Sequence, residues 1–289
     1  MKILEILGAL GFPHPVQQVT QFHTEEDGTP YNVWKLDTDR GSFVLKKTSA
    51  DEKAVYEAFF TDGGPAPAVY AFGTHESEAY MLMEYAPGTS MSNCTRPRLQ
   101  RTLDALIASQ AKYWDDTAHR EVGYGFSKSW PNRLKRLSYM RDLAPAYQAY
   151  LDAFAAVPRT LCNDDMLPFN VLADDDRAVI IDWEYAGILP YPCAISRFLA
   201  FGEEDHAEMF FMSAEDKQFA LDYYYENLVR HKGISRSEYD RTIKLFFFKE
   251  YSEWVYCAGI SGDYGMDYYK KYYAQAKHLA QELGLYPAE

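Results

Sequence analysis

The chain has 289 residues, of which 47% are hydrophobic and 25% are charged, and its formal net charge is −13 at pH 7. Such a composition is typical of a globular protein, and the length allows two lobes around a large core. The acidic balance argues against a nucleic-acid partner, because a phosphate backbone needs clustered lysine and arginine; it is compatible with a cationic small molecule, and equally with a surface that only aids solubility.

Residues 1–15 predict an amphipathic helix rather than a signal peptide, because Glu5 interrupts the apolar residues and no small-residue cleavage site follows. No apolar run approaches the ~20 residues that span a bilayer, so the sequence predicts no membrane partner. The cysteines are widely spaced without a Cys-x-x-Cys pair, and we expect reduced, buried thiols. These features predict a cytoplasmic protein, and they do not indicate any protein partner.

Alternating apolar residues predict three N-terminal strands, at residues 16–23, 31–38 and 41–47. The third strand ends in Lys46 and Lys47, whose side chains should point to opposite faces of a sheet. A helix is predicted over 49–60, with Ser49 as its N-cap and Glu52 three residues later. By themselves these residues fit an exposed strand end and a capping box as well as a binding site.

The breaker cluster at 63–67 precedes two further strand-like runs, at 69–73 and 79–88. Leucines at three- and four-residue spacing predict a core helix over 97–115, and we expect further helix over 130–150. The C-terminal hundred residues are helical in pattern and rich in aromatic residues. Most of these aromatic side chains should fill the core, and the remainder could line a pocket.

The segment LCNDDMLPFNVLADDDRAVIIDWEYAG, at 161–187, places Asp165, Asn170 and Asp182 at spacings of five and twelve. Two short apolar strands around the Asp174–Asp176 turn predict a β-hairpin, which would bring Asn170 and Asp182 side by side. Two such oxygen-bearing side chains suit Mg²⁺, which also takes phosphate oxygens and water. Asp165 could then accept a proton from a hydroxyl nucleophile. This combination predicts phosphoryl transfer.

The segment resembles the motif of the aminoglycoside phosphotransferase and choline kinase superfamily, in which His-x-Asp-x4-Asn is followed by Ile-Asp-[Phe/Trp]-Glu-[Tyr/Phe]. The matching residues here are Asn163, Asp165, Asn170 and the run Ile181-Asp182-Trp183-Glu184-Tyr185. The resemblance implies Asp165 as catalytic base, Asn170 and Asp182 as Mg²⁺ ligands, and ATP as phosphoryl donor. It also implies an α+β, two-lobed protein-kinase-like fold, with an ATP-clamping lobe at 1–89 that holds an antiparallel sheet and one helix, and a mainly helical catalytic and acceptor-binding lobe at 90–289.

The same resemblance assigns nucleotide contacts in the N-terminal lobe. Lys46 would bind the α/β-phosphates, with Glu52 as its acidic partner and Glu57 as the alternative. A loop at 24–29 would cover the phosphates, and its own contacts would come from Gly28 and Thr29, because three acidic side chains precede them. The hinge between the lobes would meet adenine through Met83, Glu84 and Ala86.

Two positions depart from the family pattern. Asn163 stands where the family has His, and an amide can donate and accept hydrogen bonds in a similar way. The Asp usually found soon after the Glu-Tyr element is absent, and Cys193-Ala194-Ile195-Ser196 occupies that stretch. The first change, with the glycine-poor loop, motivates one alternative: a nucleotide-binding pseudokinase.

The run Asp182 to Gly187 resembles most the choline and ethanolamine kinase branch, which implies a small amino alcohol as acceptor. Trp254 and Tyr256 resemble in placement the late aromatic helix that holds choline's cation, and Glu184 and Glu253 could add negative charge. An aminoglycoside or sugar acceptor is the alternative, for which carboxylates are available at Glu203, Glu204, Asp205 and Asp263. No residue pattern separates the two acceptor classes.

Overall fold

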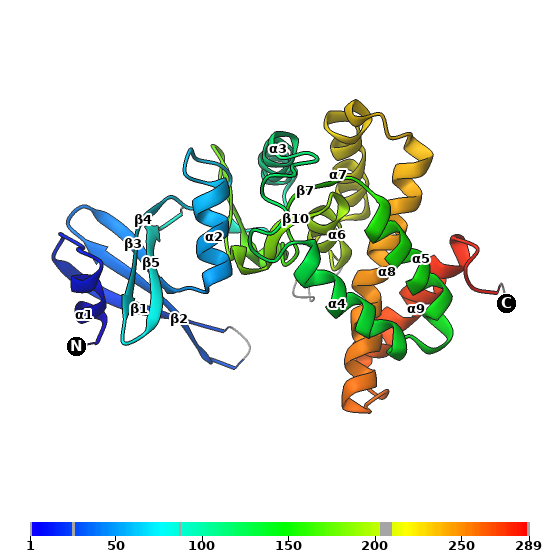
Figure 1. The fold of residues 1–289 in the computed structure, drawn as a ribbon, viewed down its shortest axis with the longest axis horizontal. Coiled ribbons are helices and arrows are strands. Elements are labelled where there is room, and N and C mark those ends of the chain that lie inside the picture. The colour runs from blue at the N-terminus through cyan, green and yellow to red at the C-terminus, as the bar shows by residue number, and fades with distance from the viewer. Residues whose placement is uncertain (1, 25–26, 87, 203–209, 288–289) are drawn as a thin grey trace.

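The computed structural model describes residues 2–24, 27–86, 88–202 and 210–287. Figure 1 shows a small lobe built around a sheet and, beside it along the long axis, a large and mainly helical lobe. The expected antiparallel sheet followed by a helical region is therefore confirmed.

The small lobe contains a five-stranded antiparallel sheet with the strand order β1-β2-β3-β5-β4. Its strands are β1 (Val16–His23), β2 (Pro30–Thr38), β3 (Gly41–Lys47), β4 (Val69–His75) and β5 (Glu78–Glu84). Helices α1 (Lys2–Ala9) and α2 (Ala50–Phe59) belong to different hydrophobic clusters. Because side chains alternate along a strand, Leu45 of β3 joins the cluster of α1, whereas Val44 packs against that of α2.

Helix α2 begins where the sequence predicts. The side chain of Ser49 accepts the backbone N–H of Glu52 at 3.1 Å, which pairs one of the donors that a helix start leaves free. The chain after the helix turns at Gly63 and Gly64, whose φ angles are 88° and 147°. Glycine adopts such angles without a steric penalty, so the breaker cluster ends the helix as expected.

The large lobe surrounds its short strands with helices. The helices are α3 (Arg96–Lys112), α4 (Phe126–Arg136), α5 (Ala144–Ala156), α6 (Pro192–Ala200), α7 (Ala214–Asn227), α8 (Arg236–Ser261) and α9 (Asp267–Glu282). The strands are β6 (Thr89–Ser90), β7 (Arg159–Asn163), β8 (Val171–Ala173), β9 (Ala178–Ile180) and β10 (Ala186–Pro190). Short 3-10 turns lie at Leu137–Tyr139, Arg141–Leu143, Pro168–Asn170, Trp183–Tyr185 and Val229–Lys232.

The short strands of the large lobe form two antiparallel units. One contains β6, β8 and β9, and the other pairs β10 with β7. Through β6, Thr89 and Ser90 pair with β8. The predicted hairpin of β8 and β9 is confirmed.

The predicted helix over 130–150 is not continuous. It is divided into α4 and α5 by two 3-10 turns, and Arg141, the first residue of the second turn, has a φ angle of 52°. Pro145 in the first turn of α5 accounts for the break. A proline inside a continuous helix would remove the hydrogen bond to residue 141 and clash with its carbonyl, whereas a proline at a helix start costs little.

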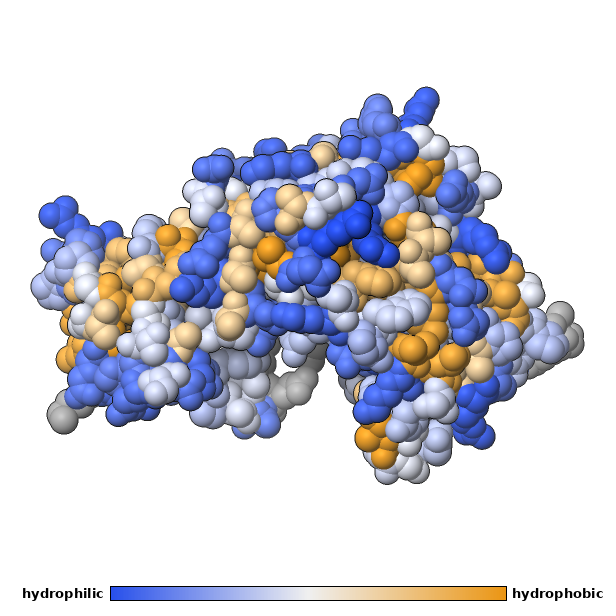
Figure 2. Space-filling model, in the orientation of Figure 1, coloured by the Kyte–Doolittle hydropathy of each residue, from blue (hydrophilic) through white to orange (hydrophobic). Residues whose placement is uncertain are grey.

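The expected burial of thiols and aromatic rings holds in large part. Cys94, Cys162 and Cys193 are free and buried, but Cys257 is free and exposed, so the prediction was wrong for that residue. Phe246 and Phe248 of α8 lie in the main core. Much of the surface in Figure 2 is hydrophilic, with apolar groups over the small lobe and the C-terminal helices. Within the described ranges, no helix combines the length and the hydropathy needed to span a bilayer.

Candidate active site

The β8–β9 hairpin brings the two predicted metal ligands together. Val171 pairs with Ile180, and the backbone N–H of Ile181 donates to the carbonyl of Asn170 at 2.8 Å. Asn170 therefore faces Ile181 at the end of the hairpin, and Asp182 follows Ile181 directly.

Asn163 connects the loop after β7 to the end of this hairpin. Its amide nitrogen donates to the carbonyl of Asp182 at 2.9 Å, and its amide oxygen accepts the backbone N–H of Asp165 at 3.0 Å. Asn163 is 1% exposed, so these bonds lie in a buried setting where an unpaired amide would be costly. The amide thus donates and accepts in the manner expected when it replaces the family histidine.

The Asn170 and Asp182 side chains present oxygens suited to a hard cation. The Asn170 amide nitrogen donates to the carbonyl of Asp165 at 2.9 Å, which leaves its amide oxygen without a hydrogen bond among the described residues. Asp182 has a φ angle of 58°, a left-handed conformation that is uncommon for non-glycine residues and that Asp tolerates better than most. No group of three or more His, Cys, Asp or Glu side chains in the described ranges could hold a metal ion alone. The pair fits Mg²⁺ that also takes phosphate oxygens.

Asp165 has one engaged and one free carboxylate oxygen. Arg197 of α6 donates to Oδ1 through Nη2 at 2.9 Å and Nε at 3.3 Å, and the described residues offer no hydrogen bond to Oδ2. Burial raises the pKa of Asp165 above its ordinary value, Arg197 offsets part of that rise, and Asp182 and Asp164 add to it. A carboxylate with one free oxygen can accept a proton from a hydroxyl group.

Arg197 was not predicted from the sequence. Its Nη1 also donates to Glu250 of α8 at 3.1 Å, and Glu250 accepts from Lys249 at 2.9 Å. Arg197 is the one charged residue in the α6 sequence PCAISRFLA, and a lone charge in an apolar helix could have signalled a buried partner.

Lys46 joins the two lobes. Its Nζ lies 2.6 Å from Glu52 Oε1 in α2 and 2.8 Å from Asp182 Oδ1 in the large lobe. Burial disfavours the charged ammonium, but Glu52 and Asp182 outweigh it and hold the pKa of Lys46 above its ordinary value. Glu52 is therefore the acidic partner of Lys46 and not only a capping residue, whereas Glu57 pairs with Lys53 at 3.5 Å.

The predicted adenine-binding residues lie at the end of β5. Met83 is buried in the hydrophobic cluster that includes α2, and Ala86 is 8% exposed. The backbone N–H of Glu84 donates to the carbonyl of Ala68 at 2.8 Å, and its side chain contacts Arg177, so neither group is free to meet a base. The N–H of Ala86 makes no hydrogen bond within the described part of the chain.

The loop between β1 and β2 is closed by its own hydrogen bonds. The N–H of Thr29 donates to Thr24 Oγ1 and to Asp27 Oδ1, each at 2.9 Å, and the N–H of Gly28 donates to Thr24. Phosphate contact through these two N–H groups would therefore require the turn to open. Two of the three acidic residues of the loop, Glu25 and Glu26, lie outside the described residues.

The predicted acceptor residues do not form one cluster. The ring of Trp254 stacks on Tyr268 and Tyr272, with centroids 4.8 and 5.9 Å apart, whereas the ring of Tyr256 contacts Tyr139 and Arg136. Residues two apart on a helix point to different sides, which explains the separation. Glu184 is exposed beside the buried Trp183. Glu253 pairs with Arg136 at 2.8 Å, and Asp263 lies in the turn after α8; Glu203, Glu204 and Asp205 lie outside the described residues.

Of the two aromatic residues, Trp254 has the closer structural link to Asp165. Trp254 follows Glu250, the partner of Arg197, by one helical turn. Phe201 lies beneath the Arg197 guanidinium and contacts Tyr272, on which Trp254 stacks. In Figure 2 the surface is indented between the small lobe and the projecting C-terminal end of α8.

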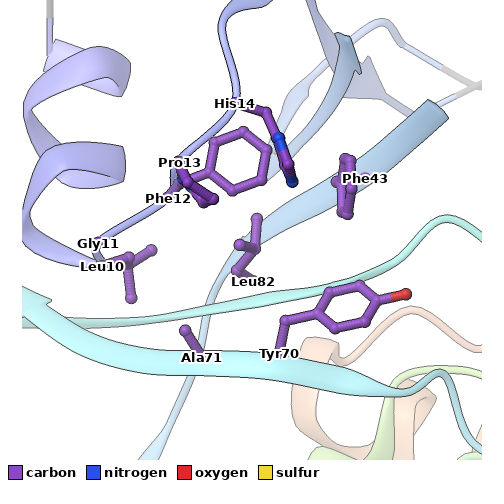
Figure 3. Close-up of a pocket in the computed structure, with 9 residues that line it drawn as sticks. All are labelled: Leu10, Gly11, Phe12, Pro13, His14, Phe43, Tyr70, Ala71 and Leu82. Atoms are coloured by element: carbon purple, nitrogen blue, oxygen red, sulfur yellow. The ribbon is translucent and has the colours of Figure 1, made fainter. Parts of the chain in front are cut away.

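A cavity of about 340 Å³ in the small lobe is separate from these residues. Figure 3 shows Phe12, His14, Phe43, Tyr70 and Leu82 around it. Phe43 lies three residues before Lys46 on β3, and positions three apart on a strand point to opposite faces of the sheet. The cavity therefore lies on the α1 face, away from Lys46.

Comparisons with known proteins give one family and several similar folds. The model of a family described as "Phosphotransferase enzyme family" matches residues 24–210. No curated protein sequence matches the chain. A choline/ethanolamine kinase family protein from Mesorhizobium loti has a TM-score of 0.65 at 16% identity, with 98% of this chain and 97% of that chain covered.

Two further solved structures share the fold. The choline kinase LicA from Streptococcus pneumoniae has a TM-score of 0.59 at 18% identity, with 97% and 98% of the two chains covered. A thermostable mutant of the aminoglycoside phosphotransferase APH(4)-Ia, in a ternary complex with AMP-PNP and hygromycin B, has a TM-score of 0.60 at 16% identity, with 96% of each chain covered. The protein-kinase-like fold expected from the sequence is thus confirmed.

The neighbouring lysines of β3 allow a matched test of stability. Replacing Lys46 with Met leaves Glu52, which is 1% exposed, without its cation, and we expect the free energy of unfolding to fall by about 3 kcal/mol. Lys47→Met removes an exposed pair with Glu78 and should cost less than about 1 kcal/mol. Urea unfolding of the two variants and the parent measures both values. Equal losses would contradict the buried role of Lys46.

Proposed function

Because the chain belongs to the phosphotransferase enzyme family, we propose that it transfers the γ-phosphoryl group of ATP to a hydroxyl of a small amino alcohol such as choline or ethanolamine. The observation that carries the proposal is the convergence of Lys46, from β3, with Asp165, Asn170 and Asp182, from the segment 161–187. These residue types are those that phosphoryl transfer requires at one site.

Asp165 acts on the acceptor. Its free Oδ2 accepts the hydrogen bond of the acceptor hydroxyl, orients that oxygen, and takes its proton as the bond to phosphorus forms. Arg197 holds the other oxygen, so the carboxylate has one orientation, and the cation lowers the pKa of Asp165 against the effect of burial. Lys46, fixed by Glu52, supplies positive charge to the phosphates.

Asn170 and Asp182 would hold Mg²⁺. The ion, when bound, neutralises charge on the phosphates during transfer. Asp182 also accepts from Lys46, so its carboxylate lies between the metal position and the phosphate-binding lysine. ATP as the donor is supported by the similar aminoglycoside phosphotransferase, which was solved with AMP-PNP.

An amino alcohol is favoured by a group of aromatic rings between α8 and α9. The nearly parallel rings of Trp254, Tyr268 and Tyr272 offer π-faces to a cationic head group, and Tyr268 is 50% exposed. The net charge of −13 is compatible with a cationic acceptor and does not decide between acceptor classes. Tyr256 and Glu184 stay predictions for the acceptor site, as do Gly28, Thr29, Met83, Glu84 and Ala86 for the nucleotide. The lobe division at 89/90 and the cytoplasmic location likewise stay predictions.

Aminoglycoside or sugar phosphorylation is the second candidate, since one similar structure is a complex with hygromycin B. A pseudokinase is the third, but the bonds made by Asn163 argue against it, because they keep Asp165 and Asp182 in register.

A panel assay tests the acceptor class. ADP release with Mg-ATP is measured across amino alcohols, aminoglycosides and sugars, and we expect turnover with choline or ethanolamine. Turnover only with aminoglycosides or sugars would reassign the acceptor. Silence on every panel, with ATP still bound in calorimetry, would favour the pseudokinase.

Two aspartates should fail in different ways. Asp165→Ala should lower kcat by at least about 100-fold with little change in nucleotide affinity, because the base acts on the acceptor. Asp182→Ala should abolish Mg²⁺-dependent nucleotide binding. Asp176→Ala, in the exposed hairpin turn, is the control and should change neither quantity. Steady-state kinetics measures kcat, and calorimetry measures nucleotide affinity. Normal turnover in Asp165→Ala would refute its role as the base, and unchanged affinity in Asp182→Ala would refute its role as a metal ligand.

Arg197 should set the acid limit of activity. A raised pKa for Asp165 means that kcat falls as the pH drops through a value above the ordinary one for Asp. Arg197→Met removes the cation that lowers this pKa, so the acid limb of kcat should move to higher pH by about 1–3 units. Arg197→Lys keeps the charge and should move it less. A pH–rate profile with an unmoved limb in Arg197→Met would sink this role.

A further inference from the structure

Asp164 has a contact that the catalytic chemistry does not use. Its carboxylate accepts two hydrogen bonds from Arg133 Nη2 of α4, at 2.7 Å to Oδ1 and 2.6 Å to Oδ2. Its backbone N–H donates to the carbonyl of Tyr185 at 3.1 Å. Burial works against the carboxylate, but Arg133 outweighs it, and Lys249 and Arg197 assist, so the pKa of Asp164 lies below its ordinary value.

Arg133 is itself held firmly. Its side chain is 2% exposed, its Nε donates to the Tyr150 hydroxyl at 2.7 Å, and its guanidinium lies 4.3 Å from the centroid of the Phe154 ring. The carbonyl of Arg133 accepts from the Tyr147 hydroxyl at 3.1 Å. The guanidinium and the backbone carbonyl of Arg133 are therefore both hydrogen-bonded to α5. The planar guanidinium is held in one orientation, in which it donates to the loop after β7.

Three consecutive residues of this loop have three different anchors. Asn163 bonds to the carbonyl of Asp182, Asp164 to Arg133, and Asp165 to Arg197. Asp164 and Asp165 are adjacent, so a rotation of the backbone at Asp164 would displace the Asp165 carboxylate directly. The Arg133 pair resists that rotation from the core side.

We propose that Arg133 is a positioning residue for the phosphoryl transfer: it holds Asp164 in the core and thereby fixes the direction of Asp165. The inference rests on the proposed function. It assigns a role to a residue 32 positions before the base in sequence.

Stability alone does not account for the pair. Two buried charges lose much of their hydration, and apolar residues of similar volume are often as stable as a buried ion pair. An ion pair with directed hydrogen bonds differs in fixing an orientation, which apolar packing does not. The two roles are therefore separable by replacing both partners at once.

The test uses Arg133→Met, the double variant Arg133→Met/Asp164→Leu, and Arg96→Met as control. Arg96 also combines an ion pair, to Asp216, with a ring contact, to Phe219, but it joins α3 to α7 and contacts none of the loop. The measurements are melting temperature, kcat and nucleotide KM, and hydrogen exchange of the backbone amides at 163–167.

We expect Arg133→Met to lose melting temperature, to lower kcat by about 10-fold or more with nucleotide KM unchanged, and to speed exchange at 163–167. The double variant should regain melting temperature but neither kcat nor exchange protection. Arg96→Met should lose melting temperature only.

The inference is overturned if the double variant regains the parent's kcat and loop exchange rates together with its melting temperature. It is also overturned if Arg96→Met lowers kcat as much as Arg133→Met does. Exchange needs no turnover, so the inference is decided even if the parent protein phosphorylates no acceptor. An inactive parent with altered loop exchange in Arg133→Met would refute the proposed function and support the anchor.

Discussion

The ion pair between Lys46 and Asp182 is the contact on which the rest of the site depends. It joins β3 of the small lobe to the end of the β8–β9 hairpin in the large lobe, over 136 positions of sequence. Glu52, on the other side of Lys46, is almost fully buried. If the Lys46 ammonium moved away, the Glu52 carboxylate would stay buried without a counter-ion, which is energetically costly. The energetic penalty of separating these charges holds Lys46 against the end of the hairpin, where we propose the metal site.

Beneath this contact, the large lobe buries several charged side chains in alternating order. Arg197 lies between Asp165 and Glu250, and Glu250 lies between Arg197 and Lys249. Each carboxylate faces a cation, which is the condition under which buried charges are tolerated. The network connects the loop after β7 to α6 and α8, and α8 also carries Trp254, so the base and the aromatic rings belong to one rigid assembly.

Local patterns carried most of what could be predicted. Strand alternation, the Ser49 cap and the hairpin turn depend on neighbours in sequence, and they placed Asn170 beside Asp182 correctly. The partner of Asp165 could not be found in this way, because Arg197 reaches it through tertiary packing of α6. The same holds for Glu52 against Glu57, since both are acidic residues of one helix and only the sheet decides which faces Lys46. Grouping Trp254 with Tyr256 ignored the helical period, which the sequence alone could have corrected.

The left-handed backbone of Asp182 has an evolutionary consequence. Asp, Asn and Gly tolerate that conformation, whereas β-branched residues do not, so the fold itself narrows what this position accepts. Asn or Gly would keep the backbone and remove the negative charge. A lineage could therefore lose the negative charge by a single substitution while keeping the hairpin and its left-handed turn, at the expense of the contact with Lys46. Inactive descendants of this architecture would then be hard to recognise by shape, and the identity of this one side chain would be the mark that distinguishes them.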